Sequence, residues 1–352
     1  MSSSCIRIGD QPIGQQHPPF VIAEMSGNHN QSLDRALALV DAAAAAGANA
    51  LKLQTYTADT ITLNMRGENF EINDKSSLWA GSNLHDLYNQ AHTPWEWHEP
   101  IMLRAKEHGI ICFSSPFDET AVDFLEDLNA PAYKIASFEN NHLPLIDKAA
   151  STGKPLIIST GMASLGELEQ AVATARSAGC KDLILLKCTS AYPACPENIN
   201  IRTMSNLREI FNCEVGLSDH TMGIGVAIAA VALGATIIEK HLTISRHEGG
   251  VDSGFSLEPA ELMELVKESN QAWKALGGVK YGPTEGELKN TFFRRSIYTI
   301  ADIEKGDLFS VENIGIIRPG NGAPTTLYPK LIGKRARRSY KRGTPLNWDV
   351  LL

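Results

Sequence analysis

The sequence predicts a (β/α)8 barrel followed by a small β-rich module. Between residue 19 and about residue 278, an apolar run followed by an amphipathic helical stretch recurs eight times. The apolar runs are continuous rather than alternating, as expected of parallel strands that are buried on both faces. Beyond Gly278 the chain turns polar and rich in turn residues, with short β-like runs between glycines and prolines. Eight strand–helix pairs of this kind are typical of a closed barrel.

The elements follow one another in strict alternation. The predicted strands lie at 19–25, 50–56, 110–117, 130–137, 154–161, 182–190, 214–220 and 235–241. The predicted helices lie at 32–48, 93–109, 118–129, 143–153, 164–179, 200–211, 223–235 and 258–277. A doubly wound open sheet is the competing fold. It is disfavoured because no glycine-rich dinucleotide fingerprint follows the first strand.

The chain divides into three predicted parts. Residues 1–280 form the catalytic barrel, 281–292 a linker and 293–352 a β-rich module. After the second strand, an insertion at 58–91 is long for a βα loop, and long loops on this side of a barrel shape substrate pockets. A solvated excursion is the alternative interpretation of the same segment.

Bulk properties limit the partners of this 352-residue chain. Hydrophobic residues make up 43% and charged residues 20%, which is ordinary for a globular enzyme. A net charge of −8 argues against nucleic acid, so an anionic substrate needs a local basic pocket. The six cysteines show no CxxC or zinc spacing, which indicates reduced thiols and a cytoplasmic location. No signal core or membrane-length apolar run is present, so no membrane partner is expected.

A histidine ends each of the last two predicted strands. Side chains alternate along a strand, so Ser218 shares a face with His220, and Glu239 shares one with His241. The carboxyl ends of barrel strands meet at one mouth, where two imidazoles and a carboxylate suit a divalent metal. The alternative is that each histidine is an ordinary hydrogen-bonded residue at a strand end.

Lysines and hydroxyls gather at the same predicted mouth. Lys52, Lys134 and Lys187 stand at or near strand ends, among several serines. This combination indicates a site for a small anion such as a phosphoester. The alternative is that the lysines extend to solvent at the rim. Lys240 is left out because it alternates away from Glu239 and His241. Parity also requires that either Lys134 or Glu139 lie in the loop beyond the regular strand.

Several motifs resemble the sialic acid synthase (NeuB-like) family. They are AEMSGNHN, KLQTY, FSSPFD, YKIAS, STGMA, LLKCTSAYP, GLSDHT, EKHLT and IRPG, in the family's order. The family condenses phosphoenolpyruvate with an N-acylated sugar, and residues 293–352 resemble its antifreeze-like (SAF) domain. The stretch LWAGSNLHDLYNQAHTPWEWH and Lys187 resemble the pseudaminic acid branch. That branch implies 2,4-diacetamido-2,4,6-trideoxy-L-altrose as the sugar, and the N-acetylneuraminate and legionaminate branches are the alternatives.

The resemblance implies roles for individual residues. His220 and His241 would hold Mn²⁺ or Mg²⁺, and Glu24 or Glu139 would stabilise positive charge or activate water. The residues that would bind the two substrates are Lys52, Gln54, Lys134, Ser137, Ser159, Lys187, Ser190, Tyr192, Ser218 and Asp252. The resemblance also implies a domain-swapped homodimer, in which Arg318 of the IRPG motif reaches the sugar bound by the other chain.

Two other classes of protein remain as alternatives. A Schiff-base aldolase would use Lys134 or Lys187 and no metal. A non-catalytic sugar-binding protein would leave the histidines and lysines without a purpose. Within the synthase interpretation, Trp79, Tyr88, Trp95 and Trp97 make the insertion and the following helix aromatic, which favours a sugar with extra apolar groups.

Overall fold

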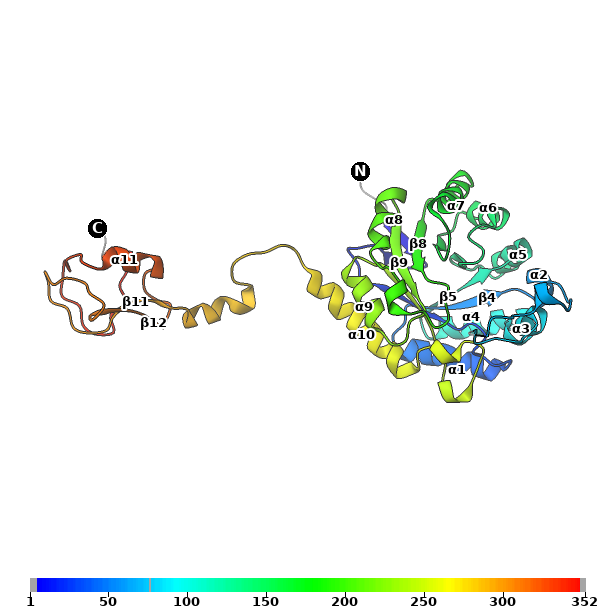
Figure 1. Cartoon of the computed structure of the whole chain (residues 1–352), viewed down its shortest axis with the longest axis horizontal. Coiled ribbons are helices and arrows are strands. Elements are labelled where there is room, and N and C mark those ends of the chain that lie inside the picture. Colours follow the sequence, from blue (N-terminus) through cyan, green and yellow to red (C-terminus); the bar gives the residue numbers. More distant parts are fainter. Residues whose placement is uncertain (1–4, 76, 349–352) are drawn as a thin grey trace. The chain divides into compact units, whose positions relative to one another are not determined.

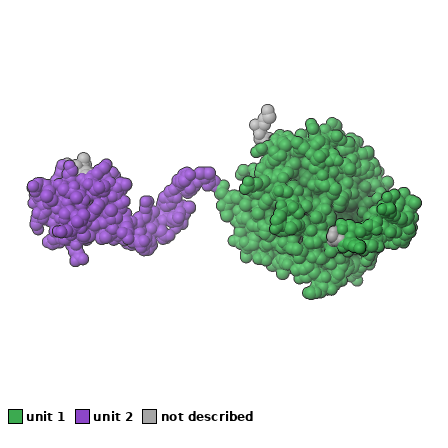
Figure 2. Space-filling model, viewed as in Figure 1, with its two compact units in different colours: residues 1–277 green, residues 278–352 purple. Residues whose placement is uncertain are grey.

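A computed structural model describes residues 5–75 and 77–348. The chain forms two compact units, residues 1–277 and 278–352 (Figure 2). None of the helices among the described residues has the length and apolarity needed to span a membrane.

The first unit is a closed barrel of eight parallel strands, as the sequence predicts (Figure 1). The strands are β3 (Phe20–Glu24), β4 (Ala50–Thr55), β5 (Ile111–Pro116), β6 (Tyr133–Ile135), β7 (Leu156–Ser159), β8 (Leu183–Cys188), β9 (Glu214–Asp219) and β10 (Ile237–His241). Closure comes from β10 pairing with β3, with His241 opposite Glu24.

Helices surround the barrel. They are α1 (Leu33–Ala45), α4 (His98–Glu107), α5 (Glu119–Asp127), α6 (Leu143–Ser151), α7 (Leu165–Ser177), α8 (Thr203–Phe211), α9 (Gly225–Ala232) and α10 (Pro259–Leu276). Local chemistry fixes several of their starts. Ser164, for example, closes a capping box with Glu167 at the start of α7.

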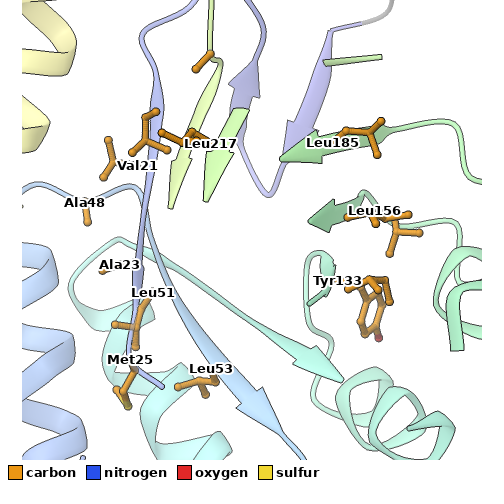
Figure 3. Packing of buried hydrophobic residues seen from close by; sticks show 14 of the residues in the cluster. Val21, Ala23, Met25, Ala48, Leu51, Leu53, Tyr133, Leu156, Leu185 and Leu217 are labelled. Atoms are coloured by element: carbon orange, nitrogen blue, oxygen red, sulfur yellow. The ribbon is translucent and has the colours of Figure 1, made fainter. Parts of the chain in front are cut away.

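Two apolar layers follow from the alternation of side chains along the strands. One layer packs strands against helices and includes Val21, Ala23, Leu51 and Leu185 (Figure 3). The other layer fills the barrel interior with the alternate residues, such as Phe20 and Ile22. In β3 the side chains that point into the barrel are therefore those of Phe20, Ile22 and, at the mouth, Glu24. We call such alternate positions of a strand its inward phase.

An N-terminal hairpin of β1 (Ile6–Ile8) and β2 (Gln11–Ile13) belongs to the inner layer. Ile6, Ile8 and Ile13 are buried in the same cluster as Phe20, at the amino-terminal end of the strands. This hairpin is not predicted from the sequence, because its two strands are only three residues long.

The predicted insertion contains α2 (Ala58–Ile61), a 3-10 turn at Glu68–Phe70 and α3 (Leu84–Ala91). Further 3-10 turns are Trp95–Trp97, Pro196–Asn198, Arg246–Glu248 and Ser253–Phe255.

The second unit has its own core. It contains a long 3-10 segment (Glu285–Phe293), the antiparallel pair β11 (Ser296–Thr299) and β12 (Ile314–Ile317), a 3-10 turn (Thr325–Leu327) and α11 (Tyr328–Leu331). Ile297, Phe309, Ile314 and Leu346 are buried in its cluster. Part of the segment expected to be a linker is thus 3-10 helix, begun by a capping box between Thr284 and Glu287.

Candidate active site

A cavity of about 450 Å³ opens at the carboxyl ends of the barrel strands. Most of the residues expected at this mouth line it. They are Glu24, Lys52, Gln54, Lys134, Ser137, Glu139, Ser159, Tyr192, Ser218, His220, Glu239, His241 and Asp252. The strand residues converge because they continue the alternation of the inward-facing positions, and the loops after the strands add Ser137, Glu139, Tyr192 and Asp252.

Two lysines and two glutamates form a charge network at the base of the cavity. Lys52 Nζ lies 2.6 Å from Glu24 Oε2 and 3.8 Å from Glu239 Oε1. Lys134 Nζ lies 3.5 Å from the same Glu239 oxygen, which also accepts a hydrogen bond of 3.2 Å from Ser218 Oγ. All four charged side chains are at most 4% exposed.

The charged groups of this network have pKa values that shift in different directions. Burial alone would raise the pKa of Glu239, but Lys134 and Lys52 outweigh it and hold this pKa well below its usual range. Burial would also lower the pKa of Lys52, yet Glu239 and Glu24 raise it. For Lys134 burial prevails over Glu239 and lowers the pKa. Lys52 is thus the firmer cation and Lys134 the one that loses its proton more readily.

The sequence predicts Glu239 at the mouth, in phase with His241 and as a carboxylate beside a metal, but it predicts no contact of Glu239 with the lysines. Its position between two lysines could have been found from parity, since Lys52, Lys134 and Glu239 all point into the barrel. The missing signal is spatial, because the network joins β4, β6 and β10.

The two histidines face each other at the same mouth. Their ring centroids are 5.3 Å apart, and His220 Nδ1 lies 3.0 Å from the carbonyl oxygen of Thr189. That contact assigns the proton to Nδ1 and leaves Nε2 with a free lone pair. Within the described residues, buried His241 Nδ1 has no hydrogen-bond partner, although Asp252 Oδ2 lies 3.5 Å away.

This donor set fits a divalent metal with few protein ligands. The described residues contain no cluster of three or more histidine, cysteine, aspartate or glutamate side chains arranged to hold a metal ion. The histidine pair would therefore supply two ligands, and the remaining positions would go to water and substrate oxygens. Open positions of this kind are typical of catalytic rather than structural metal sites.

Two further groups point to a ligand. Of the side-chain atoms that the structure describes, Ser159 Oγ and Glu139 Oε2 are buried without a hydrogen-bond partner. Buried polar atoms normally pair, so both fit contacts that a bound substrate would complete. Burial raises the pKa of Glu139 to about 7 despite the nearby Lys134. Glu139 lies in the loop after β6 while Lys134 lies within it, as parity requires.

A second set of polar residues positions Asp252 at the rim. Ser26 donates a hydrogen bond to Asp252 Oδ2, and Asn28 accepts one of 3.3 Å from the Asp252 backbone N–H. Asn28 Nδ2 also donates to Leu242 O and Ser256 Oγ, both at 2.9 Å. The AEMSGNHN motif thus fixes the loop after β10. Gly27 permits this, because a Cβ there would lie 2.5 Å from Val251 Cγ2.

Cys188 is another cavity residue without an assigned role. It ends β8 in the inward phase, and its Sγ lies 4.0 Å from His220 Nδ1. Burial would raise the pKa of this thiol, but His220 lowers it to about 7. No role for Cys188 is predicted from the sequence, because the spacing of the cysteines matches no motif.

Lys187 and Ser190 do not line the cavity. Lys187 shares the phase of Leu183 and Leu185, which face the helices, and its Nζ donates to the carbonyl of Cys188 at 2.7 Å. Its ammonium therefore lies outside the cavity lining, and its contact with substrate stays a prediction. Ser190 instead donates a hydrogen bond of 2.7 Å to Ser137, which does line the cavity. Arg318 belongs to the second unit and is exposed.

The aromatic residues of the insertion divide into two groups. Trp79 and Tyr88 line the cavity, and the Trp79 ring lies 5.6 Å from that of Tyr192. Trp95 and Trp97 are not among the residues that line it. Trp95 packs on Phe124 with centroids 4.6 Å apart, and Trp97 packs against the helical layer of the core.

The fold is a (β/α)8 barrel, and its cavity gathers buried lysines, histidines and hydroxyls, a combination that suits a small anion. Comparison with known proteins agrees: residues 39–281 match the NeuB family and residues 294–352 match the SAF domain. The chain belongs to the NeuB family.

Its relatives extend over nearly the whole chain. The pseudaminic acid synthase of Campylobacter jejuni (strain 81-176) is 45% identical over 93% of this chain and 95% of its own length. The pseudaminic acid synthase of Helicobacter pylori is 42% identical, over 94% and 97%. An N,N'-diacetyllegionaminic acid synthase of C. jejuni is 38% identical, over 92% and 97%.

Solved structures match as well. A spore coat polysaccharide biosynthesis protein of Bacillus subtilis superimposes with a TM-score of 0.67 at 34% identity, covering 99% of each chain. The N-acetylneuraminic acid synthetase of Leptospira borgpetersenii, solved in complex with citrate, gives a TM-score of 0.72 at 34% identity. It covers 82% of this chain and 95% of its own.

Proposed function

We propose that this protein is a pseudaminic acid synthase. It would condense phosphoenolpyruvate with 2,4-diacetamido-2,4,6-trideoxy-L-altrose to give a nonulosonic acid and phosphate. The observation that carries the proposal is the meeting of two buried lysines, a histidine pair and unpartnered polar atoms in one barrel mouth. The relatives named pseudaminic acid synthase support the choice of sugar.

The anionic substrate would lie over the charge network. Lys52 and Lys134 provide cations, while Ser159, Ser218 and Ser137 provide hydroxyl donors around them. Gly161 lies close to this group: its φ is +49°, and a Cβ there would approach Ser137 Cβ to 2.7 Å. Ser190 supports Ser137 rather than the substrate.

The sugar would extend from the histidines toward Gln54, Tyr192 and Asp252. A Mn²⁺ or Mg²⁺ ion held by His220 and His241 would polarise the aldehyde as a Lewis acid. C3 of phosphoenolpyruvate would form a bond to the aldehyde carbon, the aldehyde oxygen would take up a proton to become a hydroxyl, and positive charge would develop at C2. Water adds to C2, and the adduct loses phosphate by breaking the C2–O bond, which yields the 2-keto acid.

The geometry favours different roles for the two glutamates. Lys52 and a 2.8 Å hydrogen bond from Gln54 hold the Glu24 carboxylate, which is thus oriented to stabilise positive charge at C2. Glu139 has an unpartnered oxygen and a pKa of about 7, which suits a general base for the attacking water.

A second subunit would complete the sugar site. We propose a homodimer in which Arg318 of the partner subunit contacts the sugar. The SAF module carries a basic run, KRARRSYKR at 334–342, on a chain whose net charge is −8. Such charge asymmetry favours association between copies of the chain.

The test is an incubation with phosphoenolpyruvate, Mn²⁺ and candidate amino sugars, with phosphate release and product mass as readouts. Phosphoenolpyruvate labelled with ¹⁸O at the bridging position should deliver the label to phosphate. Label retained in the keto acid would eliminate the mechanism. Preference for N-acetylmannosamine would instead indicate the neuraminate branch.

A Schiff-base aldolase keeps one supporting observation, the lowered pKa of buried Lys134. Borohydride reduction in the presence of a keto acid would attach the substrate to Lys134 in that case. In the synthase, the protein mass should stay unchanged and a chelator should abolish turnover.

A further inference from the structure

Helix α3 presents an apolar face to the active-site cavity rather than to the core. Leu84, Leu87, Tyr88 and Ala91 all line the cavity, and their spacing of three, four and seven residues places them on one side of a helix. Ile61, Ile72 and Trp79 of the same insertion line the cavity as well. We call α3's Leu84, Leu87 and Tyr88, together with Ile61, Ile72 and Trp79, the insertion wall.

Polar contacts on its other sides hold α3 in place. Asn83 caps the helix by accepting from the His85 backbone N–H at 3.1 Å, and its amide donates to the carbonyl of Met65 at 2.7 Å. His85 Nε2 lies 2.9 Å from Asp59 Oδ1, which ties α3 to α2. Since the helix is anchored in this way, its apolar face is not needed for attachment and remains only partly buried.

The insertion wall begins close to the reacting end of the cavity. The Tyr192 ring lies 4.5 Å from His220 and 5.6 Å from Trp79, so two ring contacts separate the histidine from the wall. Tyr56, which also lines the cavity, packs against Tyr88 with ring centroids 5.8 Å apart. A sugar whose aldehyde carbon lies at the histidines would direct its far carbons toward this wall.

The side chains of the insertion wall offer few hydrogen-bonding groups to the far carbons of such a sugar. The one donor of Trp79 is already used, because Nε1 donates to Val251 O at 2.9 Å. The leucine and isoleucine side chains have none, so the Tyr88 hydroxyl is the remaining polar group among the six wall residues. A C6 hydroxyl held against Leu84 and Leu87 would lose its hydrogen bonds to water without replacement, whereas a methyl group there would gain from burial.

From this geometry we propose that the inward face of α3 selects the sugar by its C6 group. It would favour a 6-deoxy sugar, whose methyl packs on Leu84 and Leu87, over a sugar with a C6 hydroxyl. The inference rests on the proposed function and adds to it the residues that determine specificity.

The experiment compares two sugars that differ at one atom. They are 2,4-diacetamido-2,4,6-trideoxy-L-altrose and its 6-hydroxy counterpart, each assayed for kcat/KM at saturating phosphoenolpyruvate. The unsubstituted enzyme should prefer the 6-deoxy sugar by about tenfold to a hundredfold. Leu87→Asn and Leu84→Asn should each reduce this preference to about threefold or less, because the new amide can bond the C6 hydroxyl.

Matched variants separate specificity from general damage. Leu63→Asn changes the same residue type in the same insertion, but Leu63 is 58% exposed and does not line the cavity, so the preference should persist. Leu87→Met leaves the surface apolar, so this variant should also retain the preference for the 6-deoxy sugar. The KM for phosphoenolpyruvate should stay within about twofold in all four variants, since that substrate binds at the charged end of the cavity.

The outcomes are distinct. Normal turnover with an unchanged preference in both Leu84→Asn and Leu87→Asn would overturn this inference alone. Equal loss of preference in Leu63→Asn would also overturn it, by showing that the effect does not depend on the cavity face. If the unsubstituted enzyme released no phosphate with either sugar, the proposed function itself would fail.

Discussion

Replacing Glu239 by glutamine should destabilise the barrel strongly. Glu239 is 4% exposed and lies between two buried ammonium groups, 3.5 Å from Lys134 and 3.8 Å from Lys52. In Glu239→Gln, Lys52 retains Glu24 at 2.6 Å, but Lys134 loses the ion-pair partner it has among the described residues. Removing one member of a buried pair typically costs about 3 to 5 kcal/mol, because a charge is left uncompensated.

Urea unfolding followed by tryptophan fluorescence would measure this loss at pH 7. Glu107→Gln is the matched control, since Glu107 is 56% exposed and pairs with Arg104 at 3.6 Å on the surface. Such exposed pairs contribute about 1 kcal/mol or less. A loss below about 1 kcal/mol in Glu239→Gln, or an equal loss in the control, would refute the reasoning.

The pH dependence supplies an independent check on Lys134. Burial already lowers the pKa of Lys134 in the folded protein, and loss of Glu239 should lower it further. The unfolded chain then binds more protons than the folded one between that lowered pKa and the ordinary lysine value of about 10.5. Stability of Glu239→Gln should therefore rise with pH across this window, which should begin at a lower pH than in the unsubstituted protein.

Three further predictions address the catalytic groups. His220→Ala or His241→Ala should reduce turnover at least about a hundredfold and abolish Mn²⁺ binding in calorimetry without unfolding the barrel; turnover within threefold would contradict the metal site. If the Glu139 carboxylate is the base, kcat/KM should fall about tenfold per pH unit below about 7, and Glu139→Gln should remove this limb of the profile. A limb that persists in Glu139→Gln would assign it to another group. Arg318→Ala should weaken sugar binding and spare phosphoenolpyruvate, and mixing it with His220→Ala should restore some activity after subunit exchange. No recovery despite exchange would exclude a shared site.

The sequence is sufficient to predict the barrel and most of the residues at its mouth. Continuous apolar runs identify the strands, and alternation along them directs Glu24, Lys52 and His241 to one cavity. The same rule applied to strand β8 directs Lys187 away from the cavity, because its phase matches that of Leu185 rather than that of Leu186.

The sequence is much less informative about the insertion. Its aromatic content suggests a pocket wall, but nothing local distinguishes Trp79, which reaches the cavity, from Trp97, which packs in the core. That difference depends on where a loop returns to the barrel. Trp79 is positioned by its hydrogen bond to the carbonyl of Val251, which is 172 residues away in the sequence. No local sequence pattern could predict this contact.

Binding of metal and of phosphoenolpyruvate should be coupled through the charge at the base of the cavity. The positive charges of Lys52 and Lys134 are already opposed by Glu24 and Glu239 in the free protein, so the lysines alone provide little net attraction for an added anion. A divalent cation at the histidine pair would supply the missing positive charge.

Calorimetric titration should therefore show phosphoenolpyruvate binding about tenfold more weakly in the presence of a chelator than with Mn²⁺. By linkage, phosphoenolpyruvate should strengthen Mn²⁺ binding by the same factor. Equal affinities with and without the metal would show that the lysines and hydroxyls hold the anion by themselves, and that the glutamates move away from them when it binds.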